Sequence, residues 1–313
     1  MSTFYGAKLP DSIPPSCKHV NNFPKRKARS DNDEEAGAVR GGGTPAQRAL
    51  GINSKSQSKL LSQRFERYAN QDQAAKLLKP FSKWVGNCHR FWVDKNQKIG
   101  VMFNPVREKA HFSNIFTCGS VWGCPVCAAK ISEKRRIELK KGIATHRKQG
   151  GFVALLTLTN SHHHGHALKD LLAGQRKALA YFWGDRKTKE YFKSIGKVGH
   201  IVAREVTHGE NGWHPHFHIL LFLENNFSTA ALLAIREFLA VQWVNCCFKA
   251  GLPLPDLKHG LDLKDGSYAE QYVGKWGLEH ELTKGHIKKG KQGGLTPFDL
   301  LKLSKDDEKS GKL

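Results

Sequence analysis

The pattern of apolar and polar positions is clearest between residues 151 and 303, where strands and helices follow one another in a readable order. The run "FVALLTLT" at 152–159 has the length and apolar content of a buried strand. Residues 168–183 repeat their apolar positions every three or four residues, which predicts an amphipathic helix. Residues 200–206, "HIVAREV", then predict a second strand.

The second half of this region repeats the scheme. A third strand ends in the apolar run 219–223, and the polar stretch "THGENGWHP" before it suits a hairpin loop. Ser228 is a typical N-cap for the next helix, and residues 259–264 predict a weak edge strand. Strand, helix, strand, strand, helix, strand is the split βαβ, or ferredoxin-like, pattern. We therefore predict an α+β fold whose antiparallel sheet carries helices on one face.

Three histidines lead into the third strand, in the sequence "GWHPHFHILLFLEN". His214, His216 and His218 occupy every second position, so a strand places their side chains on one face. Alternating imidazoles at the start of a core strand favour a site for a divalent ion. Glu205 is a candidate third ligand, because it shares the histidine face in half of the possible hairpin registers. His214 is the rival ligand, and the spacing does not choose between them.

A second chemical motif follows, "SYAEQYVGKWGLE" at 267–279. Its SxxE start is a capping box, so a helix is expected to begin there. Tyr268, Tyr272 and Lys275 then fall on one helical face. Two tyrosines four residues apart are usually packing residues, but beside a metal site one phenol oxygen can attack a DNA phosphate. Since a free phenol has a pKa near 10, it needs a nearby cation or metal, and Lys275 is a candidate for helping to bind the ion or the phosphate.

Four cysteines in the region before the sheet have spacings typical of a structural zinc site. Three lie within ten residues, two of them as CxxC with a proline in the turn, and a fourth precedes them. The candidate ligands are Cys88, Cys118, Cys124 and Cys127. Buried or redox thiols are the alternative explanation of the CxxC, and His89 and His111 are substitutes for the fourth ligand.

Composition narrows the class of partner. Fifty Lys and Arg against 28 Asp and Glu give a net charge of +22, which favours a polyanion such as nucleic acid. We expect no apolar stretch to reach the roughly 18 residues of a membrane span, and the amino terminus shows no signal-peptide core. We therefore expect a cytoplasmic protein that does not bind membranes. Seven cysteines, an odd number, favour thiols and metal over disulfides.

The chain is expected to divide into four parts. Residues 1–55 are poor in apolar side chains and predict a disordered arm. Residues 56–150 form a helical and zinc-binding region, which begins with a helical stretch at 60–84 and ends with a basic helix. Residues 151–303 form the domain with the histidines and tyrosines. Residues 304–313 predict a disordered tail.

Four stretches together resemble the HUH endonucleases that initiate rolling-circle replication of plasmids. "HPHFH" is similar to their metal motif, and "YAEQYVGK" is similar to their tyrosine motif in its two-tyrosine form. "LLTLTNSH" resembles their first motif, and "CGSVWGCPVCAAKIS" resembles the cysteine cluster of the plasmid initiators. The resemblance spans about Cys88 to Leu301 in the same order.

The resemblance implies a mechanism and a set of partners. An initiator of this type nicks one strand at the double-strand origin, forms a 5′-phosphotyrosine link, frees a 3′ hydroxyl and later rejoins the displaced strand. Carried over, His216 and His218 bind Mg²⁺ or Mn²⁺, Tyr272 is the initiating nucleophile and Tyr268 is the candidate for termination. The cysteines bind Zn²⁺. The implied partners are plasmid origin DNA, host helicase and host DNA polymerase, all in the cytoplasm.

Three other functions fit parts of the sequence. A single-strand transposase of the same superfamily also combines a zinc cluster with two tyrosines. A non-catalytic zinc-containing DNA-binding protein would use the tyrosines to stack on bases. A metal hydrolase would use the three histidines as a zinc centre, and its reaction would survive loss of both tyrosines.

Overall fold

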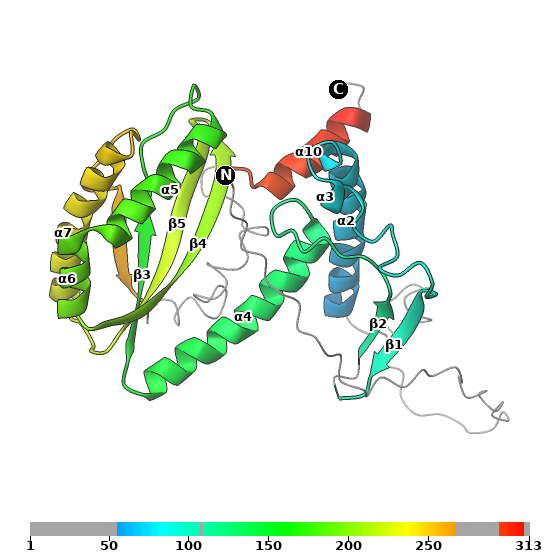
Figure 1. Ribbon diagram of the computed structural model, residues 1–313, viewed down its shortest axis with the longest axis horizontal. Helices are drawn as coiled ribbons and strands as arrows, with labels where there is room; N and C mark the ends of the chain where they lie inside the picture. The colour runs from blue at the N-terminus through cyan, green and yellow to red at the C-terminus, as the bar shows by residue number, and fades with distance from the viewer. Residues whose placement is uncertain (1–54, 107–108, 267–293, 310–313) are drawn as a thin grey trace. The chain divides into compact units, whose positions relative to one another are not determined.

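The computed structural model describes residues 55–106, 109–266 and 294–309 (Figure 1). These residues form two compact units. The smaller contains residues 55–61, 87–106 and 109–117, and the larger contains residues 62–86, 118–266 and 294–309. The predicted arm, apart from its last residue, lies outside the described residues, as does the segment with both tyrosines and Lys275.

A four-stranded antiparallel sheet organises the larger unit, in the order β4-β5-β3-β6. The prediction of an antiparallel sheet is confirmed, and the weak strand lies at an edge as expected. β4 is longer than predicted and forms the other edge. The strands are β3 (Phe152–Leu158), β4 (Lys197–Gly209), β5 (Gly212–Leu223) and β6 (Leu261–Asp265).

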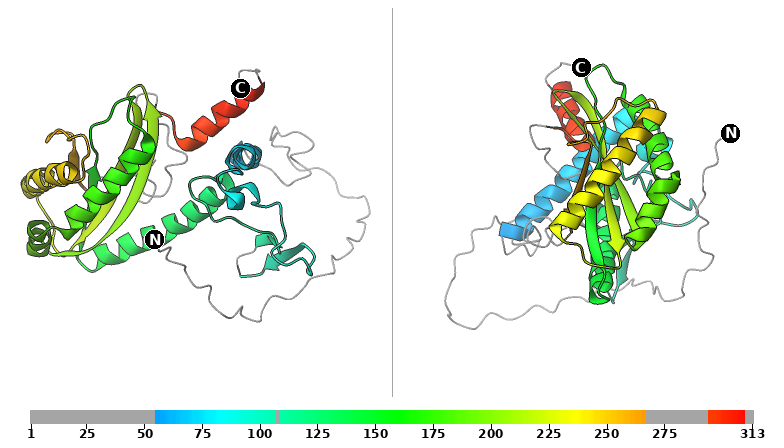
Figure 2. Two further views of the ribbon diagram at one scale, coloured as in Figure 1. Left: turned by 45° about the horizontal axis from the view of Figure 1, so that its top comes forward. Right: turned by 90° about the vertical axis from the view of Figure 1, so that its left-hand side faces the viewer.

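Three helices belong to the main core on one face of the sheet, as Figures 1 and 2 show. They are α5 (Leu168–Gly184), α6 (Arg186–Ser194) and α7 (Thr229–Lys249). Odd-numbered side chains of β5, such as Ile219 and Leu221, pack against Phe182 and Trp243 from these helices. The Trp243 Nε1 donates a hydrogen bond of 2.6 Å to the Thr159 carbonyl, which satisfies its buried polar atom. Ser228 caps α7 as predicted.

The prediction that helices cover one face of the sheet is wrong. The helix α4 (Pro125–Lys148) packs Leu139 and Ile143 against Val153 and Leu220 on the other face. The physical reason is that β5 is apolar at even as well as odd positions near its end, so both faces need cover. The His146 Nε2 lies 3.0 Å from the Leu223 carbonyl oxygen and 3.2 Å from that of Phe152.

The helix α7 passes a length and composition test for a membrane span, with mean hydropathy 1.4, which contradicts the expectation from sequence. Seven of its side chains are buried in the protein, among them Leu239 and Trp243. A core helix that is apolar around much of its circumference meets the same criteria. The apolar character of α7 is thus explained by its packing.

The connection between β4 and β5 is tighter than the predicted loop. Gly209 pairs with Gly212, so Glu210 and Asn211 form a two-residue turn. Gly212 has φ of +82°, which suits glycine. Thr207, His208 and residues 213–215, placed in a loop by their polarity, therefore belong to paired strands.

The smaller unit contains a hairpin that sequence analysis did not predict. Its strands are β1 (Gly100–Asn104) and β2 (Lys109–Ser113). Both strands are short, and their apolar residues Val101, Phe103 and Phe112 are exposed, so the hairpin lacks the apolar alternation that marks a half-buried strand. The predicted helical stretch 60–84 is divided into α2 (Lys55–Leu78) and α3 (Lys83–Gly86), with Pro80 between them.

The last described element, α10 (Pro297–Lys309), corrects the predicted tail. Thr296 and Asp299 cap it reciprocally: the Thr296 backbone N–H donates to the Asp299 carboxylate, and the Asp299 N–H donates to the Thr296 hydroxyl. Residues 304–309 continue the helix where we predicted disorder. They are polar, but no glycine or proline interrupts them before Gly311.

Candidate metal centres

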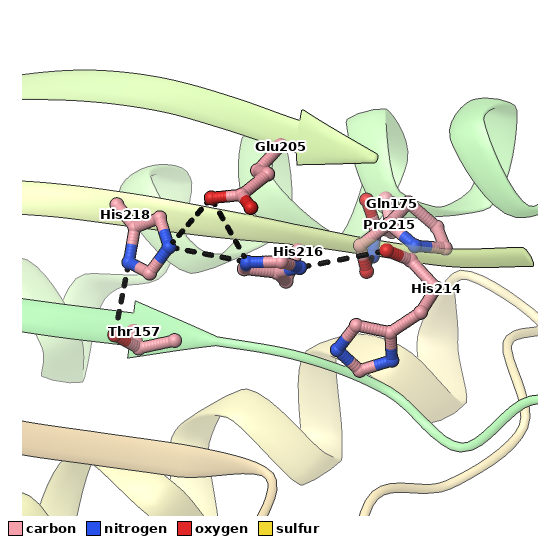
Figure 3. A network of polar contacts seen from close by, with 7 residues as sticks. All are labelled: Thr157, Gln175, Glu205, His214, Pro215, His216 and His218. Atoms are coloured by element: carbon pink, nitrogen blue, oxygen red, sulfur yellow. Dashed lines mark hydrogen bonds and ion pairs between the residues drawn. The ribbon is translucent and has the colours of Figure 1, made fainter. Parts of the chain in front are cut away.

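Glu205, His216 and His218 converge on one face of the sheet (Figure 3). β4 contributes the carboxylate and β5 contributes both imidazoles. Glu205 lies directly opposite His216 in the register, which is one of the registers that place it on the histidine face. This is the face that α4 covers further along β5, because His216 and His218 share the parity of Leu220.

The ligand atoms form a small triangle. The Nε2 atoms of His216 and His218 are 3.1 Å apart, and the Glu205 Oε2 lies 3.5 Å from the first and 3.2 Å from the second. Ligands about 2.1 Å from one divalent ion, at right angles to tetrahedral angles, lie about 3.0–3.4 Å from each other. The three atoms therefore fit a single ion held by two histidines and a carboxylate.

Neighbouring groups orient the two imidazoles. The Nδ1 of His218 lies 3.3 Å from the Thr157 hydroxyl, and the Nδ1 of His216 lies 3.5 Å from the His214 carbonyl oxygen. A carbonyl oxygen can only accept, so the second contact is a hydrogen bond when Nδ1 of His216 carries the proton. In that tautomer Nε2 keeps its lone pair for an ion.

The Glu205 carboxylate and the His218 imidazole are buried, which destabilises the fold unless another interaction offsets their lost hydration. Glu205 is 9% exposed and His218 is 8% exposed. A buried carboxylate is destabilising unless opposite charge or hydrogen bonds offset its lost hydration. A bound cation, or a protonated imidazole, supplies that charge. The arrangement is therefore typical of a functional site rather than of a packing core.

His214, the rival third ligand, is not a member of this group of ligand atoms. Its Nδ1 is 3.3 Å from the Nδ1 of His162, in the loop after β3. Burial, followed by repulsion from the imidazoles of His216 and His162, lowers the pKa of His214 to about 4. The ring is neutral at pH 7. The structure thus groups Glu205, rather than His214, with the histidine pair.

Sequence reasoning missed the residues that support the site. Gln175 on α5 is fully buried, and its Nε2 donates to the Asn160 Oδ1 at 2.8 Å and to the Pro215 carbonyl at 2.7 Å. It thereby holds the backbone of β5 in place at Pro215, between His214 and His216. A glutamine on the apolar face of the predicted helix was the available signal. Thr157 lies in the stretch that resembles the first motif, but its own role was not indicated, since β3 is otherwise apolar around it.

A second group consists of four thiols. The sulfur atoms of Cys88, Cys118, Cys124 and Cys127 all lie within 4.8 Å of one another. Those of Cys118 and Cys127 are 3.7 Å apart, which matches the roughly 3.8 Å edge of a tetrahedron with metal–sulfur distances of about 2.3 Å.

Backbone N–H groups surround these sulfurs. That of Ser120 donates to the Cys118 sulfur and that of Cys127 donates to the Cys124 sulfur, both at 3.4 Å. Such donors stabilise thiolates. The four predicted cysteines thus form a candidate metal site, and His89 and His111 are not members of the group.

The predicted catalytic residues Tyr268, Tyr272 and Lys275 lie outside the described residues. The described chain before them ends at Gly266, whose N–H donates to the Val153 carbonyl at 2.8 Å. After them, Leu295 exchanges two backbone hydrogen bonds with His208 on β4. The described residues on either side of this segment are therefore hydrogen-bonded to the sheet.

Comparison with known proteins relates the middle of the chain to replication proteins. Residues 110–240 match a family described as "Replication protein". This range includes the metal triad and three of the four cysteines, but not Cys88, Tyr268 or Tyr272. No solved structure matches the chain significantly.

Two curated proteins from Streptomyces are similar to the chain. "Protein rep" of Streptomyces lividans is 29% identical over 245 residues, which are 60% of this chain and 53% of that protein. "Neomycin resistance protein" of Streptomyces cyanogenus is 31% identical over 134 residues, which are 35% of this chain and 31% of that protein. The chain thus spans about half the length of the first relative and about a third of the second.

Proposed function

We propose that the chain is a rolling-circle plasmid replication initiator of the two-tyrosine HUH type. The observation that carries the proposal is the triad of Glu205, His216 and His218, within a region similar to replication proteins. Such an initiator nicks one DNA strand at the double-strand origin and later rejoins the displaced strand. Tyr272 is the proposed initiating nucleophile and Tyr268 the proposed residue for termination.

The topology of the larger unit supports this class. A helix-containing connection joins β3 to β4, a tight turn joins β4 to β5, and α7 joins β5 to β6. With the antiparallel order β4-β5-β3-β6, this is the arrangement expected of a ferredoxin-like sheet. The two strands that carry the triad are adjacent, so one hairpin supplies all three ligands.

The proposed reaction exchanges one phosphodiester for another. The Tyr272 oxygen forms a bond to phosphorus and the bond from phosphorus to the 3′ oxygen breaks. The phenol gives up its proton to solvent, and the departing 3′ oxygen takes one from solvent. The products are a 5′-phosphotyrosine link and a 3′ hydroxyl. Glu205, His216 and His218 would hold a divalent ion, whose charge would neutralise and polarise the phosphate. We assign Mg²⁺ or Mn²⁺ to this site, and Lys275 to phosphate or phenolate stabilisation.

Chain length permits the tyrosine to reach the triad. The Gly266 N–H is hydrogen-bonded to the Val153 carbonyl. Thr157 lies four residues, or about 13 Å, further along β3. Tyr272 follows Gly266 by six residues, which span up to about 20 Å when extended. A phenol adds its own length. The attachment point is thus consistent with attack at a phosphate beside His218.

The cysteine group suits zinc, since four thiolates in a tetrahedral arrangement are a typical structural zinc site. The net charge of +22 suits binding to origin DNA. Host helicase and DNA polymerase are the further partners that this function requires, and it takes place in the cytoplasm.

A covalent-trapping assay tests the function. The protein is incubated with labelled single-stranded oligonucleotides from its own replicon, with Mn²⁺, Mg²⁺ or EDTA, and resolved on denaturing gels. We expect a metal-dependent adduct with wild type and with Tyr181→Phe, an exposed tyrosine of α5, and none with Tyr272→Phe. Binding without any adduct would favour a non-catalytic DNA-binding protein. Cleavage without either Tyr268 or Tyr272 would favour a hydrolase.

A further inference from the structure

A cavity of about 250 Å³ lies beside the metal triad, on the side of His214. It opens where the chain leaves β3 and where it approaches β6. We call it the side cavity. Among the described residues it is lined by Thr159, Asn160, Ser161, His162, His214, Pro255, Asp256, His259 and Gly260.

The backbone around the side cavity is closely packed. The Thr159 N–H donates to the Gly260 carbonyl at 2.9 Å, which joins its two walls. A Cβ at Gly260 would lie 2.4 Å from the Cβ of Pro255 and 2.7 Å from the Asp256 carbonyl oxygen, so a larger residue does not fit there. The Ser161 hydroxyl donates to the Leu254 carbonyl at 2.7 Å. The cavity is therefore bounded by backbone that is held in place.

His214 is shared between the side cavity and the triad. Its ring centroid is 4.9 Å from that of His216 and 4.6 Å from that of His162. The His162 and His214 rings are tilted by 58°, which gives the cavity two neighbouring aromatic surfaces. A group in the cavity would thus contact His214, whose ring neighbours that of the candidate ligand His216.

The opposite wall carries a polar pair. The Nδ1 of His259 is 3.3 Å from the Oδ2 of Asp256, and both side chains are exposed. The Asp256 Oδ1 accepts from the Lys258 N–H, which orients the carboxylate. By contrast, the amide of Asn160 accepts from Gln175 and donates to the Ser161 carbonyl. Asp256 and His259 are thus suited to contact a ligand, while Asn160 supports the wall.

We propose that the side cavity holds one unstacked nucleobase of the DNA strand whose phosphate lies at the triad. This inference rests on the proposed function and names the nucleotide feature that the site reads. Imidazole faces stack on a base, and a carboxylate accepts from an exocyclic amino group. The cavity therefore favours adenine, cytosine or guanine over thymine, which has no such group.

The rival occupant is a second metal ion. The Nδ1 atoms of His162 and His214 are close enough to share one, at 3.3 Å. However, the described residues that gather three or more ligand atoms within 4.8 Å form two groups, and neither includes this pair. The cavity is also much larger than a single ion bound by two histidines requires, and such an ion would leave Asp256 and His259 without a role. A planar ring explains more of the site than an ion does.

The test is a binding measurement that does not require cleavage of the DNA. Fluorescence anisotropy of the full chain, in EDTA, is measured with an origin oligonucleotide in which each nucleotide in turn is made abasic. We expect one position next to the scissile phosphate where loss of the base weakens binding about 5- to 100-fold. Thymine at that position should bind more weakly than cytosine.

Variants connect that position to the side cavity. In Asp256→Ala and in His259→Ala, loss of the base should weaken binding much less than it does in wild type, and Asp256→Asn should reduce the preference against thymine. Glu190→Ala, which removes an exposed carboxylate of α6, is the matched control and should behave as wild type. A sensitive base whose effect persists in both alanine variants would overturn the proposal, as would the absence of any sensitive position.

The two proposals fail separately. An adduct that depends on Tyr272, with no base effect linked to Asp256 or His259, would retain the nicking function and reject the cavity as a base site. A base effect that the variants abolish, without any adduct, would retain the cavity and reject the nicking function. Binding of one Mn²⁺ that His162→Ala removes and Glu205→Ala leaves intact would show an ion in the cavity and overturn the base proposal.

Discussion

Glu205 and His216 face each other across the β4 and β5 pair, with the Glu205 Oε2 3.5 Å from the His216 Nε2. Because the two residues are opposed, a shift of the register by one residue would turn the carboxylate to the other face of the sheet. The tight turn at Glu210 and Asn211 sets that register. The convergence of the three candidate ligands is thus tied to the geometry of one hairpin.

Glu205→Gln should reduce the affinity for Mn²⁺ by about 100-fold or more, since loss of even a supporting hydrogen bond to a ligand typically costs 10- to 100-fold. The amide preserves the shape of the side chain but removes its charge. Isothermal titration calorimetry measures the change. Glu210→Gln, in the turn, is the control and should bind as wild type; equal binding by both variants would show that Glu205 is not a ligand.

Thr157→Val should also lower the affinity for Mn²⁺ by about 10- to 100-fold, because it removes the hydroxyl beside the Nδ1 of His218. Valine matches the shape of threonine, so the strand should keep its packing. Thr157→Ser keeps the hydroxyl and should recover most of the affinity. If serine and valine are equally weak, the effect comes from packing and not from orientation of the imidazole.

Cys127→Ala should remove one equivalent of zinc per chain and lower the unfolding temperature, because a bound structural ion contributes to folding. Elemental analysis of the purified protein gives the stoichiometry. Cys246→Ala is the matched control, since its thiol is buried in the main core and should affect packing without loss of zinc. Full zinc occupancy in the Cys127 variant would contradict the assignment.

Asp185→Ala should destabilise the protein by about 1 kcal/mol at pH 7, the usual cost of losing an N-cap. The Asp185 carboxylate accepts from the backbone N–H of Thr188 at 2.9 Å and from its hydroxyl at 3.2 Å. The N–H bond is the main cause that lowers the pKa of Asp185 below its usual 3.8.

The pH dependence follows from that direction. A depressed folded-state pKa means that the contribution is present above about pH 4 and is lost as the pH falls through the folded-state value. Urea unfolding at pH 7 and at pH 3 should therefore show a smaller difference between Asp185→Ala and wild type at the lower pH. Asp185→Asn should retain most of the stability at both pH values. A difference that grows on acidification would contradict the prediction.

The parts of the structure that sequence predicted are those where a single period dominates. The alternation of His214, His216 and His218 is fixed by strand geometry, and their common face needed no knowledge of the fold. The third ligand beside His216 and His218 could not be predicted, because the hairpin register could place Glu205 on either face of the sheet. Local sequence does not reveal which residues lie opposite each other when polar residues continue through the turn.

The remaining differences have physical causes in particular residues. Leu139 and Ile143 lie among the many basic residues of α4, so the apolar contact of that helix with the sheet was hidden. Thr157 and Gln175 support the site through tertiary hydrogen bonds, which have no sequence period. The hairpin β1–β2 carries too few buried side chains to show an alternating pattern.

The edge position of β4 affects how copies of the chain behave together in solution. Of the described residues outside β5, Leu295 pairs with this thirteen-residue strand, at His208. Within the described part of the chain, the rest of its outer edge pairs with no strand, and an unpaired edge is a template for strands of other molecules. Val198 and Ile201 are exposed there, while the net charge of +22 makes copies repel one another. Colloidal stability therefore depends on that repulsion, and salt that screens it promotes association through β4.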